Sequence, residues 1–208
     1  MYDGNCLKIL SSNGTLIDRC KFPGLSVVFK GRGGIVTIVN PSRIKKSYIE
    51  VGNNCSIFID DSCDIVGNLT IFATAENSKV TIGKRCSFSG VVIRMQGEPG
   101  LKVEIGDRCL FSSEINIRST DSHTVYDINS LEAVNVPYAI TIGSHVWVGY
   151  GCEILKNSVI KSNCVVGTRA VIAGKFDREY CAIAGIPARV VKENVNWSWN
   201  NTYDYMRK

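Results

Sequence analysis

The sequence of 208 residues contains no apolar stretch close to the roughly 18 residues that a transmembrane helix requires. Residues 1–6 carry neither the basic segment nor the apolar segment of a secretion signal. The net charge is only +5 and no run of five or six like charges occurs, so nothing resembles a nucleic-acid-binding arm. We therefore expect a cytoplasmic protein with no membrane span and no nucleic-acid partner.

Other absences narrow the class of protein further. The nine cysteines include no Cys-x-x-Cys pair, and without an export signal a disulfide framework is not expected. The two histidines are too few for a three-histidine zinc site, and we expect no metal. The 19 glycines follow no period of three, which excludes collagen, and 45% hydrophobic residues exclude disorder. The length suits one domain with a small appendage.

A short phrase ending in glycine recurs along the chain. It occurs at residues 48–52 (YIEVG), 79–83 (KVTIG), 102–106 (KVEIG) and 139–143 (AITIG). In the last third of the chain the repeat has a period of six, marked by the aliphatic residues Ile142, Val148, Ile154, Ile160, Val166 and Ile172. A period of six fits neither an α-helix nor a simple hairpin, but it suits a coil with a short strand and a turn on each face. The repeat predicts a β-solenoid.

Most of the cysteines follow this repeat. Cys55, Cys86, Cys109, Cys152 and Cys164 lie at its small-residue position. We interpret them as compact hydrophobic side chains facing the core at a corner, rather than as metal or redox groups. Cys6, Cys20, Cys63 and Cys181 have no assignment.

The pattern of Ile or Val, Gly, two variable residues and a small residue resembles that of the hexapeptide-repeat acyltransferases. The resemblance covers residues 49–191 and includes the closing segment 183–192 (IAGIPARVVK). It implies an all-β fold, the left-handed parallel β-helix, over residues 48–191. Residues 25–29 and 35–39 read as strands, so we expect residues 1–47 to cap the open end as a hairpin or an atypical coil. Residues 192–208 are expected to form a short tail.

One connection between coils is much longer than its equivalents. Phe72, Arg94 and Arg118 occupy equivalent positions in their coils. The isoleucine of the next repeated segment, Ile82, Ile105 or Ile142, lies 10, 11 or 24 residues further along the chain, respectively. The insertion therefore protrudes as a loop over residues 119–138. Because a solenoid does not need such a loop for stability, we expect it to be functional. It contains His123, the first catalytic candidate.

The spacing of His123 and Trp147 resembles that of the catalytic pair in bacterial sialic acid and capsule O-acetyltransferases. The resemblance implies that His123 is the general base and that Trp147 lies beside the reacting thioester. Asp121 or Asp127 would orient the imidazole. Alternatively, Trp147 is covered by the long loop or by a neighbouring subunit. The other histidine, His145, is expected to be a solvated corner residue.

The resemblance also implies contacts with the acyl donor, acetyl-coenzyme A. Gly149 and Thr168 match positions whose backbone runs beside the pantetheine arm, and Lys175 and Arg189 match basic residues that meet its phosphates. For each basic residue a plain surface role stays open.

Arg94 and Arg118 are expected to lie one coil apart on the face that leads to His123. Such a pair suits a carboxylate or phosphate on the acceptor. Alternatively, the two arginines pair with Glu104, Glu114 or Asp121 as a structural ladder.

We therefore expect an acetyl-coenzyme A-dependent O-acetyltransferase that modifies a sugar hydroxyl in capsule, lipopolysaccharide or sialic acid. The resemblance also implies a homotrimer with sites in the clefts between subunits. An acetyltransferase of the same fold acting on an antibiotic, serine or an amino sugar is the alternative enzyme. The alternative that is not an enzyme is a catalytically silent β-solenoid, which would be an interaction or structural protein.

Overall fold

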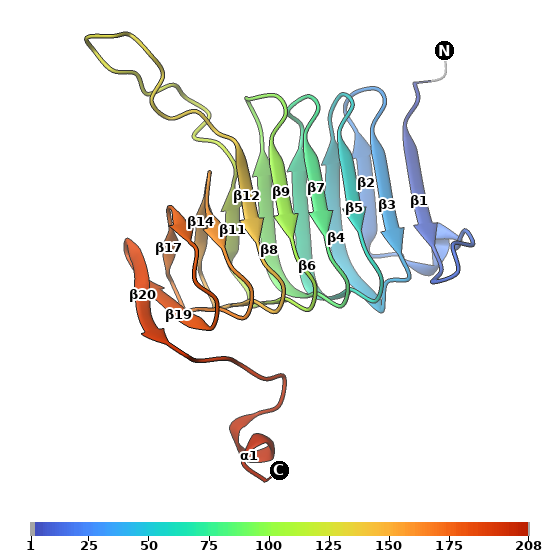
Figure 1. The fold of residues 1–208 in the computed structure, drawn as a ribbon. Coiled ribbons are helices and arrows are strands. Elements are labelled where there is room, and N and C mark those ends of the chain that lie inside the picture. Colours follow the sequence, from blue (N-terminus) through green and yellow to red (C-terminus); the bar gives the residue numbers. More distant parts are fainter. Residues whose placement is uncertain (1–2, 208) are drawn as a thin grey trace.

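The computed structural model describes residues 3–207, which wind into a β-helix with three faces (Figure 1). The chain passes from the first face to the second and the third, and then enters the next coil, where each strand pairs in parallel with its equivalent. The left-handed parallel β-helix predicted from the sequence is confirmed.

The first face is a sheet of eight strands. In order they are β1 (Cys6–Leu10), β3 (Ile35–Val39), β5 (Ser56–Ile59), β7 (Lys79–Ile82), β9 (Lys102–Ile105), β12 (Ala139–Ile142), β15 (Val159–Ile160) and β18 (Lys175–Phe176).

The second and third faces form one sheet of twelve strands, because three long strands bend around the edge between them. These strands are β4 (Arg43–Val51), β6 (Asp64–Ala73) and β8 (Ser87–Met95). The second face continues with β10 (Leu110–Phe111), β13 (Trp147–Val148), β16 (Val165–Val166), β19 (Cys181–Gly185) and the antiparallel β20 (Ala188–Glu193). The third face adds β2 (Leu25–Phe29), β11 (Ile115–Arg118), β14 (Glu153–Leu155) and β17 (Val171–Ile172). The described helical elements are the 3-10 turn η1 (Arg19–Lys21) and α1 (Thr202–Tyr205) near the C-terminus.

We number the edges by the faces that they join, so that the first edge lies between the first and second faces. The second edge joins the second and third faces, and the third edge joins the third face to the next coil. At the first edge, Arg85, Arg108 and His145 have φ angles of 57°, 54° and 56°. This left-handed conformation is uncommon for residues other than glycine, and here it makes the sharp turn between two faces.

A column of buried cysteines lines the inside of the first edge. Its members are Cys63, Cys86, Cys109, Cys164 and Cys181, each 0% exposed. The thiols of Cys63, Cys86 and Cys109 each donate a hydrogen bond of 3.1 Å to a glycine carbonyl in the following coil. Burial raises the pKa of Cys164 to about 12. The compact buried role expected for Cys86, Cys109 and Cys164 therefore extends to Cys63 and Cys181, which had no assignment.

One of the four repeated phrases does not belong with the other three. Tyr48 lies in β4 on the third face and pairs with Thr70, whereas β7, β9 and β12 lie on the first face. The strand equivalent to these three is β5. The expected alignment of residues 48–52 is therefore wrong, and Cys55 lies at the third edge, outside the cysteine column. A β-helix needs aliphatic residues on every face, so similar phrases arise on different faces.

The N-terminal region joins the helix directly. β2 pairs in parallel with β4, and β3 pairs in parallel with β1 and β5, so β2 and β3 do not form a hairpin with each other. Residues 1, 2 and 208, which belong to the expected cap and tail, lie outside the described residues.

Close stacking at the second edge requires glycine at position 67. A Cβ atom at Gly67 would lie 1.7 Å from the backbone oxygen of Ser89, whereas at Gly90 the nearest atoms, the Cβ and Cα of Ser113, would lie at 3.0 and 3.1 Å. We expect Gly67→Ala to lower the free energy of unfolding by about 2–3 kcal/mol, and the control Gly90→Ala by about 1 kcal/mol or less. Urea denaturation measures both values. Equal losses would contradict the stacking described here.

Candidate active site

The loop of residues 119–138 leaves the third edge after β11 and returns to β12, and it projects well beyond the other coils (Figure 1). Asn157, in the following coil, fixes its return. The Asn157 side chain accepts a hydrogen bond from the Tyr138 amide at 2.6 Å and donates one to the Val136 carbonyl at 2.9 Å. Tyr126 and Ala133 form an antiparallel bridge further out. The loop is therefore anchored at its base and braced along its length.

Asp121 ties the start of the loop to the rest of the solenoid. Its carboxylate lies 2.5 Å from the Lys156 ammonium and accepts a bond of 2.8 Å from the Asn135 amide. The hydrogen bond from Lys156, followed by that from Asn135, lowers the pKa of Asp121 below its ordinary value. The same Asn135 amide group donates to the backbone oxygen of His123 at 2.8 Å. Asp121 thus holds the segment that carries His123.

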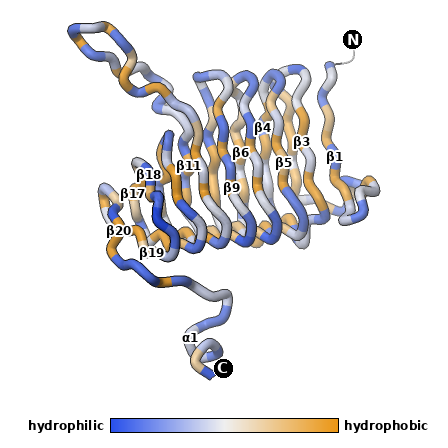
Figure 2. Tube along the Cα trace, in the orientation of Figure 1, coloured by the Kyte–Doolittle hydropathy of each residue, from blue (hydrophilic) through white to orange (hydrophobic). Residues whose placement is uncertain are grey.

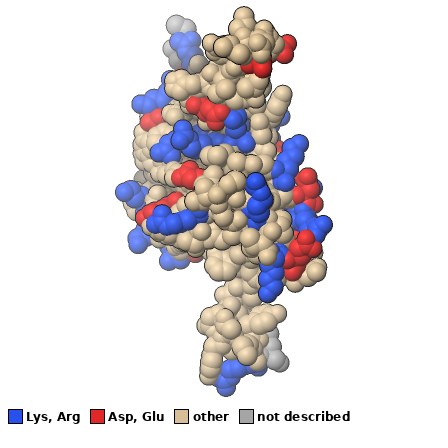
Figure 3. Space-filling model, turned by 90° about the vertical axis from the view of Figure 1, so that its left-hand side faces the viewer, with Lys and Arg blue, Asp and Glu red and all other residues tan. Residues whose placement is uncertain are grey.

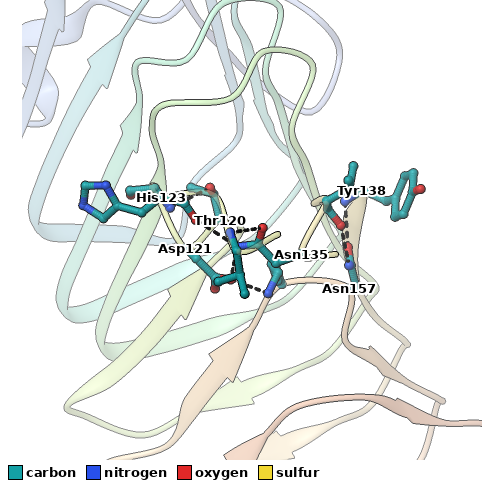
Figure 4. Close-up of polar contacts among 10 residues, drawn as sticks. Thr120, Asp121, His123, Asn135, Tyr138 and Asn157 are labelled. Carbon is teal, nitrogen blue, oxygen red and sulfur yellow. Dashed lines mark hydrogen bonds and ion pairs between the residues drawn. The ribbon is translucent and has the colours of Figure 1, made fainter. Parts of the chain in front are cut away.

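The imidazole of His123 is exposed and points away from this network (Figure 4). The Asp121 carboxylate faces Lys156 and Asn135 instead. Asp127 accepts hydrogen bonds from the Asn129 and Ser130 amides, which shapes the loop tip. The expectation that one of these aspartates orients the imidazole stays a prediction, because in this structure both carboxylates have other partners.

Trp147 lies on the second face, between Leu110 and Val165 of the adjoining coils, and its side chain is 41% exposed. The C-terminal tail, rather than the long loop, is its neighbour. The Trp197 ring lies 6.2 Å from the Trp147 ring, centroid to centroid, at an angle of 47°. Trp147 is thus open to solvent on one side and faces the tail on the other.

His145 anchors the tail at this place. The Trp197 ring stacks on the His145 imidazole at 4.4 Å and 12°, and its indole N–H donates to the His145 carbonyl at 2.8 Å. The imidazole Nδ1 also lies 3.2 Å from the Asn163 side-chain oxygen. His145 is therefore a half-buried corner residue that holds the tail, and the expectation of a merely solvated residue is wrong, because a tail without a repeat carries no pattern that predicts its return to this coil.

The tail and Trp147 enclose a pocket with a volume of about 580 Å³. Its lining includes Trp147, Val165, Trp197, Asn200, Asn201 and Tyr205. Aromatic rings and amide groups border it, so the pocket suits an uncharged portion of a ligand.

Within one chain, His123 and Trp147 lie on opposite sides of the helix. His123 projects from the third edge, and Trp147 lies on the second face, which does not border that edge. Figure 3 shows the loop at the top of the molecule and the tail, which contacts Trp147, at the bottom. A single chain does not bring the two candidate catalytic side chains together.

The four candidate donor residues divide between two edges. Gly149 and Thr168 occupy the second edge in successive coils, and Arg189 is paired with Ala184 in the coil after them. A Cβ atom at Gly149 would lie 2.8 Å from the Thr168 nitrogen, so stacking alone already requires glycine there. Lys175 begins β18 at the third edge and is exposed.

Arg94 and Arg118 lie side by side in adjacent strands of the third face, as expected. The Arg94 guanidinium donates to the Asn116 side chain at 3.0 Å and lies 5.7 Å from the centroid of the Phe72 ring. In residues 3–207 the ion pairs found involve neither arginine. The described residues therefore show no salt-bridge ladder of these arginines with Glu104, Glu114 or Asp121, although the charge of Arg118 helps to lower the pKa of Asp121.

Among the described residues, no group of three or more His, Cys, Asp and Glu side chains is arranged to hold a metal ion. No helix in residues 3–207 has the length and apolar character needed to cross a bilayer.

The Asp121–Lys156 pair is expected to hold the loop at neutral pH. Because the folded-state pKa of Asp121 is lowered, this contribution is complete above the ordinary aspartate value of about 3.9. It is lost as the pH falls through the lower folded-state value. We expect Asp121→Asn at pH 7 to speed amide hydrogen exchange at Val125 and Val134 several-fold. The control Glu132→Gln, in the same loop, should match the wild type, and unchanged exchange in Asp121→Asn would contradict the anchor.

Comparison with known proteins places the chain in a family. No family model matches it. The polysialic acid O-acetyltransferase of Neisseria meningitidis is 33% identical over 201 residues, which cover 95% of this chain and 74% of that protein. The solved structure of the polysialic acid O-acetyltransferase OatWY gives a TM-score of 0.70 at 27% identity and covers 97% of this chain and 92% of that one. The structure of the acetyltransferase NeuO gives a TM-score of 0.61 at 25% identity, with 96% and 91% covered. The chain therefore belongs to the polysialic acid O-acetyltransferases, a family of hexapeptide-repeat acyltransferases.

Proposed function

We propose that this enzyme transfers an acetyl group from acetyl-coenzyme A to a hydroxyl of sialic acid in a bacterial surface glycan. The observation that carries the proposal is the 33% identity to a polysialic acid O-acetyltransferase across 95% of the chain. The paired arginines Arg94 and Arg118 support an acidic acceptor, because guanidinium groups bind carboxylates through charge-assisted hydrogen bonds.

His123 is the proposed general base. Its imidazole takes the proton from the sugar hydroxyl as that oxygen attacks the thioester carbonyl. The tetrahedral oxyanion then collapses, the C–S bond breaks, and the coenzyme A thiolate takes the proton from the imidazolium. The exposure of the ring and the anchoring of its backbone by Asn135 support this role. Base catalysis of this kind contributes a rate factor of about 10²–10⁴.

Trp147 is the proposed donor-side residue. Its indole N–H is suited to donate to the thioester sulfur or the oxyanion. Gly149, Thr168 and Arg189 lie in successive coils near Trp147. They would line the path of the bound donor from the reacting carbon toward its far end. Lys175 lies at the third edge, so it would contact a phosphate only of a donor that is bound to a neighbouring copy.

We infer that the working enzyme is a homotrimer whose site combines the His123 loop of one copy with the Trp147 face of another. The opposite placement of the two side chains supports this inference. The loop also contains apolar residues, which colour parts of its tube orange in Figure 2, and several of their side chains are exposed. Ile128, Leu131 and Tyr138 are 81%, 72% and 72% exposed, as expected of a surface that packs against a neighbour. A cytoplasmic location fits the nine free cysteines.

The first test is release of coenzyme A from acetyl-coenzyme A in the presence of sialylated or neutral glycans. We expect turnover with the sialylated acceptor, and a fall in kcat of about 10²- to 10⁴-fold in His123→Ala. The control Glu132→Gln should keep wild-type kcat. A His123→Ala variant with more than half the wild-type rate would contradict the assigned base.

Arg118→Ala separates acceptor binding from donor binding. Losing one charge-assisted contact should raise the KM for the sialylated acceptor about tenfold and leave the KM for acetyl-coenzyme A unchanged. Lys84→Ala, at the first edge, removes an exposed charge on the side of the helix opposite the third face and is the matched control. Equal, small effects on both KM values in Arg118→Ala would contradict an acidic acceptor at this place.

A further inference from the structure

A row of side chains on the third face leads from the base of the loop toward the N-terminal coils. Arg118 in β11 is paired with Arg94 in β8, and Arg94 with Phe72 in β6. In β4 the residue in register with Phe72 is Glu50, and the Tyr48 ring, two residues earlier on the same face, packs edge-on against Phe72, with 6.1 Å between centroids and 62° between planes. We call Arg118, Arg94, Phe72 and Tyr48 the stripe.

Contacts along the stripe hold its side chains in place. The Arg94 guanidinium lies over the Phe72 ring and donates to Asn116. Asn116 in turn donates to the Glu153 carboxylate at 2.8 Å. The Tyr48 hydroxyl donates to Glu50 at 2.5 Å. These groups are therefore fixed on an outer face of the helix, although the buried core does not require rings at these positions.

The stripe is long enough for several sugar units. Neighbouring strands lie roughly 4.8 Å apart, so the three steps from β11 to β4 span roughly 14 Å along the helix axis. All four side chains remain at least partly exposed. The surface between the loop and the first coils is thus accessible along its length.

The excess of positive charge is concentrated at the N-terminal end of the helix, toward which the stripe runs from β11. Residues 1–50 contain eight Lys and Arg but only three Asp and Glu, which accounts for the whole net charge of +5. These residues form β1 to β4, at the far end of the helix from the tail (Figure 1). Lys45 and Lys46 in β4 are exposed there. A concentration of one sign of charge attracts a polymer of the opposite sign.

We propose that the stripe extends the acceptor site from Arg118 and Arg94 toward the N-terminal coils, where it binds the extended chain of an anionic glycan beyond the reacting sugar. Carboxylates of the chain pair with the arginines and with the basic first coils, and sugar rings lie against Phe72 and Tyr48. The proposal rests on the proposed function, because it places the reacting sugar at the loop and the following units along the stripe. In this proposal Phe72 and Tyr48 contribute to the preference of the enzyme for long acceptors over short ones.

Phe72→Ala tests the aromatic part of the stripe, with Phe58→Ala as its control. Phe58 is 36% exposed and lies on the first face, so its removal deletes a similar ring away from the stripe. The measured quantity is the KM for a long sialic acid polymer divided by that for a two- or three-unit acceptor. We expect this ratio to rise about fivefold in Phe72→Ala and to stay unchanged in Phe58→Ala. Equal ratios in both variants would overturn the proposal.

Charge reversal tests the basic coils. We expect Lys45→Glu with Lys46→Glu to raise the KM for the long polymer several-fold and to weaken its dependence on salt. Lys84→Glu with Lys161→Glu makes the same change of charge at the first edge, opposite the third face, and should have no such effect. The same loss in both double variants would mean that net charge alone matters, which would contradict a defined site.

A binding measurement separates this proposal from the proposed function. Calorimetric titration of the enzyme with the long polymer, without acetyl-coenzyme A, reports binding even if no acceptor turns over. Weaker binding in Phe72→Ala than in Phe58→Ala supports the stripe, whatever the rate of transfer. Turnover of sialylated acceptors with identical polymer affinity in both variants would keep the enzyme and overturn the stripe. Equally tight binding of duplex DNA would also overturn it, because the surface would then not distinguish a glycan.

Discussion

The parallel pairing of each strand with its equivalent one coil later is the constraint on which the rest of the structure depends. It requires every coil to return to the same place, so the inward side chains form columns of similar size. The cysteine column at the first edge is one result, because a thiol fills a narrow corner and bonds to the carbonyl of the next coil. Gly67 is another, since the approach of two coils leaves no room for a Cβ atom. The resulting prism is rigid and exposes its polar residues in rows.

Several features were predictable from the sequence because they follow directly from this repetition. The regular period from Ile142 onward predicted the solenoid, and the equivalence of Phe72, Arg94 and Arg118 is confirmed by their register. The long connection after Arg118 stood out only because the other coils are regular. Once the repeat assigns each residue to a face or an edge, the loop falls at the third edge and Trp147 falls on another face.

Other features depend on contacts between segments that no repeat relates. Residues 48–52 resemble phrases of the first face, but they lie on the third, because all faces share the same aliphatic pattern. The Asp121–Lys156 pair joins residues 35 positions apart, and Trp197 reaches His145 from a tail without periodicity. The roles of His123 and the donor residues came from resemblance to a family, since spacing alone does not specify chemistry.

A rigid prism also explains why one chain does not hold a complete site. The helix does not bend to bring the third edge to the second face, so within one chain the loop of His123 and the face of Trp147 stay apart, and the proposed trimer is what brings them together. The most direct test is subunit mixing, with His123→Ala and Trp147→Ala chains co-expressed and purified as mixed oligomers. Each variant alone should be nearly inactive. The mixture should recover about a third of the wild-type rate, because one of the three sites in each mixed trimer then receives both intact side chains. No recovery above the sum of the separate variants, in oligomers shown to contain both chains, would contradict a site shared between subunits.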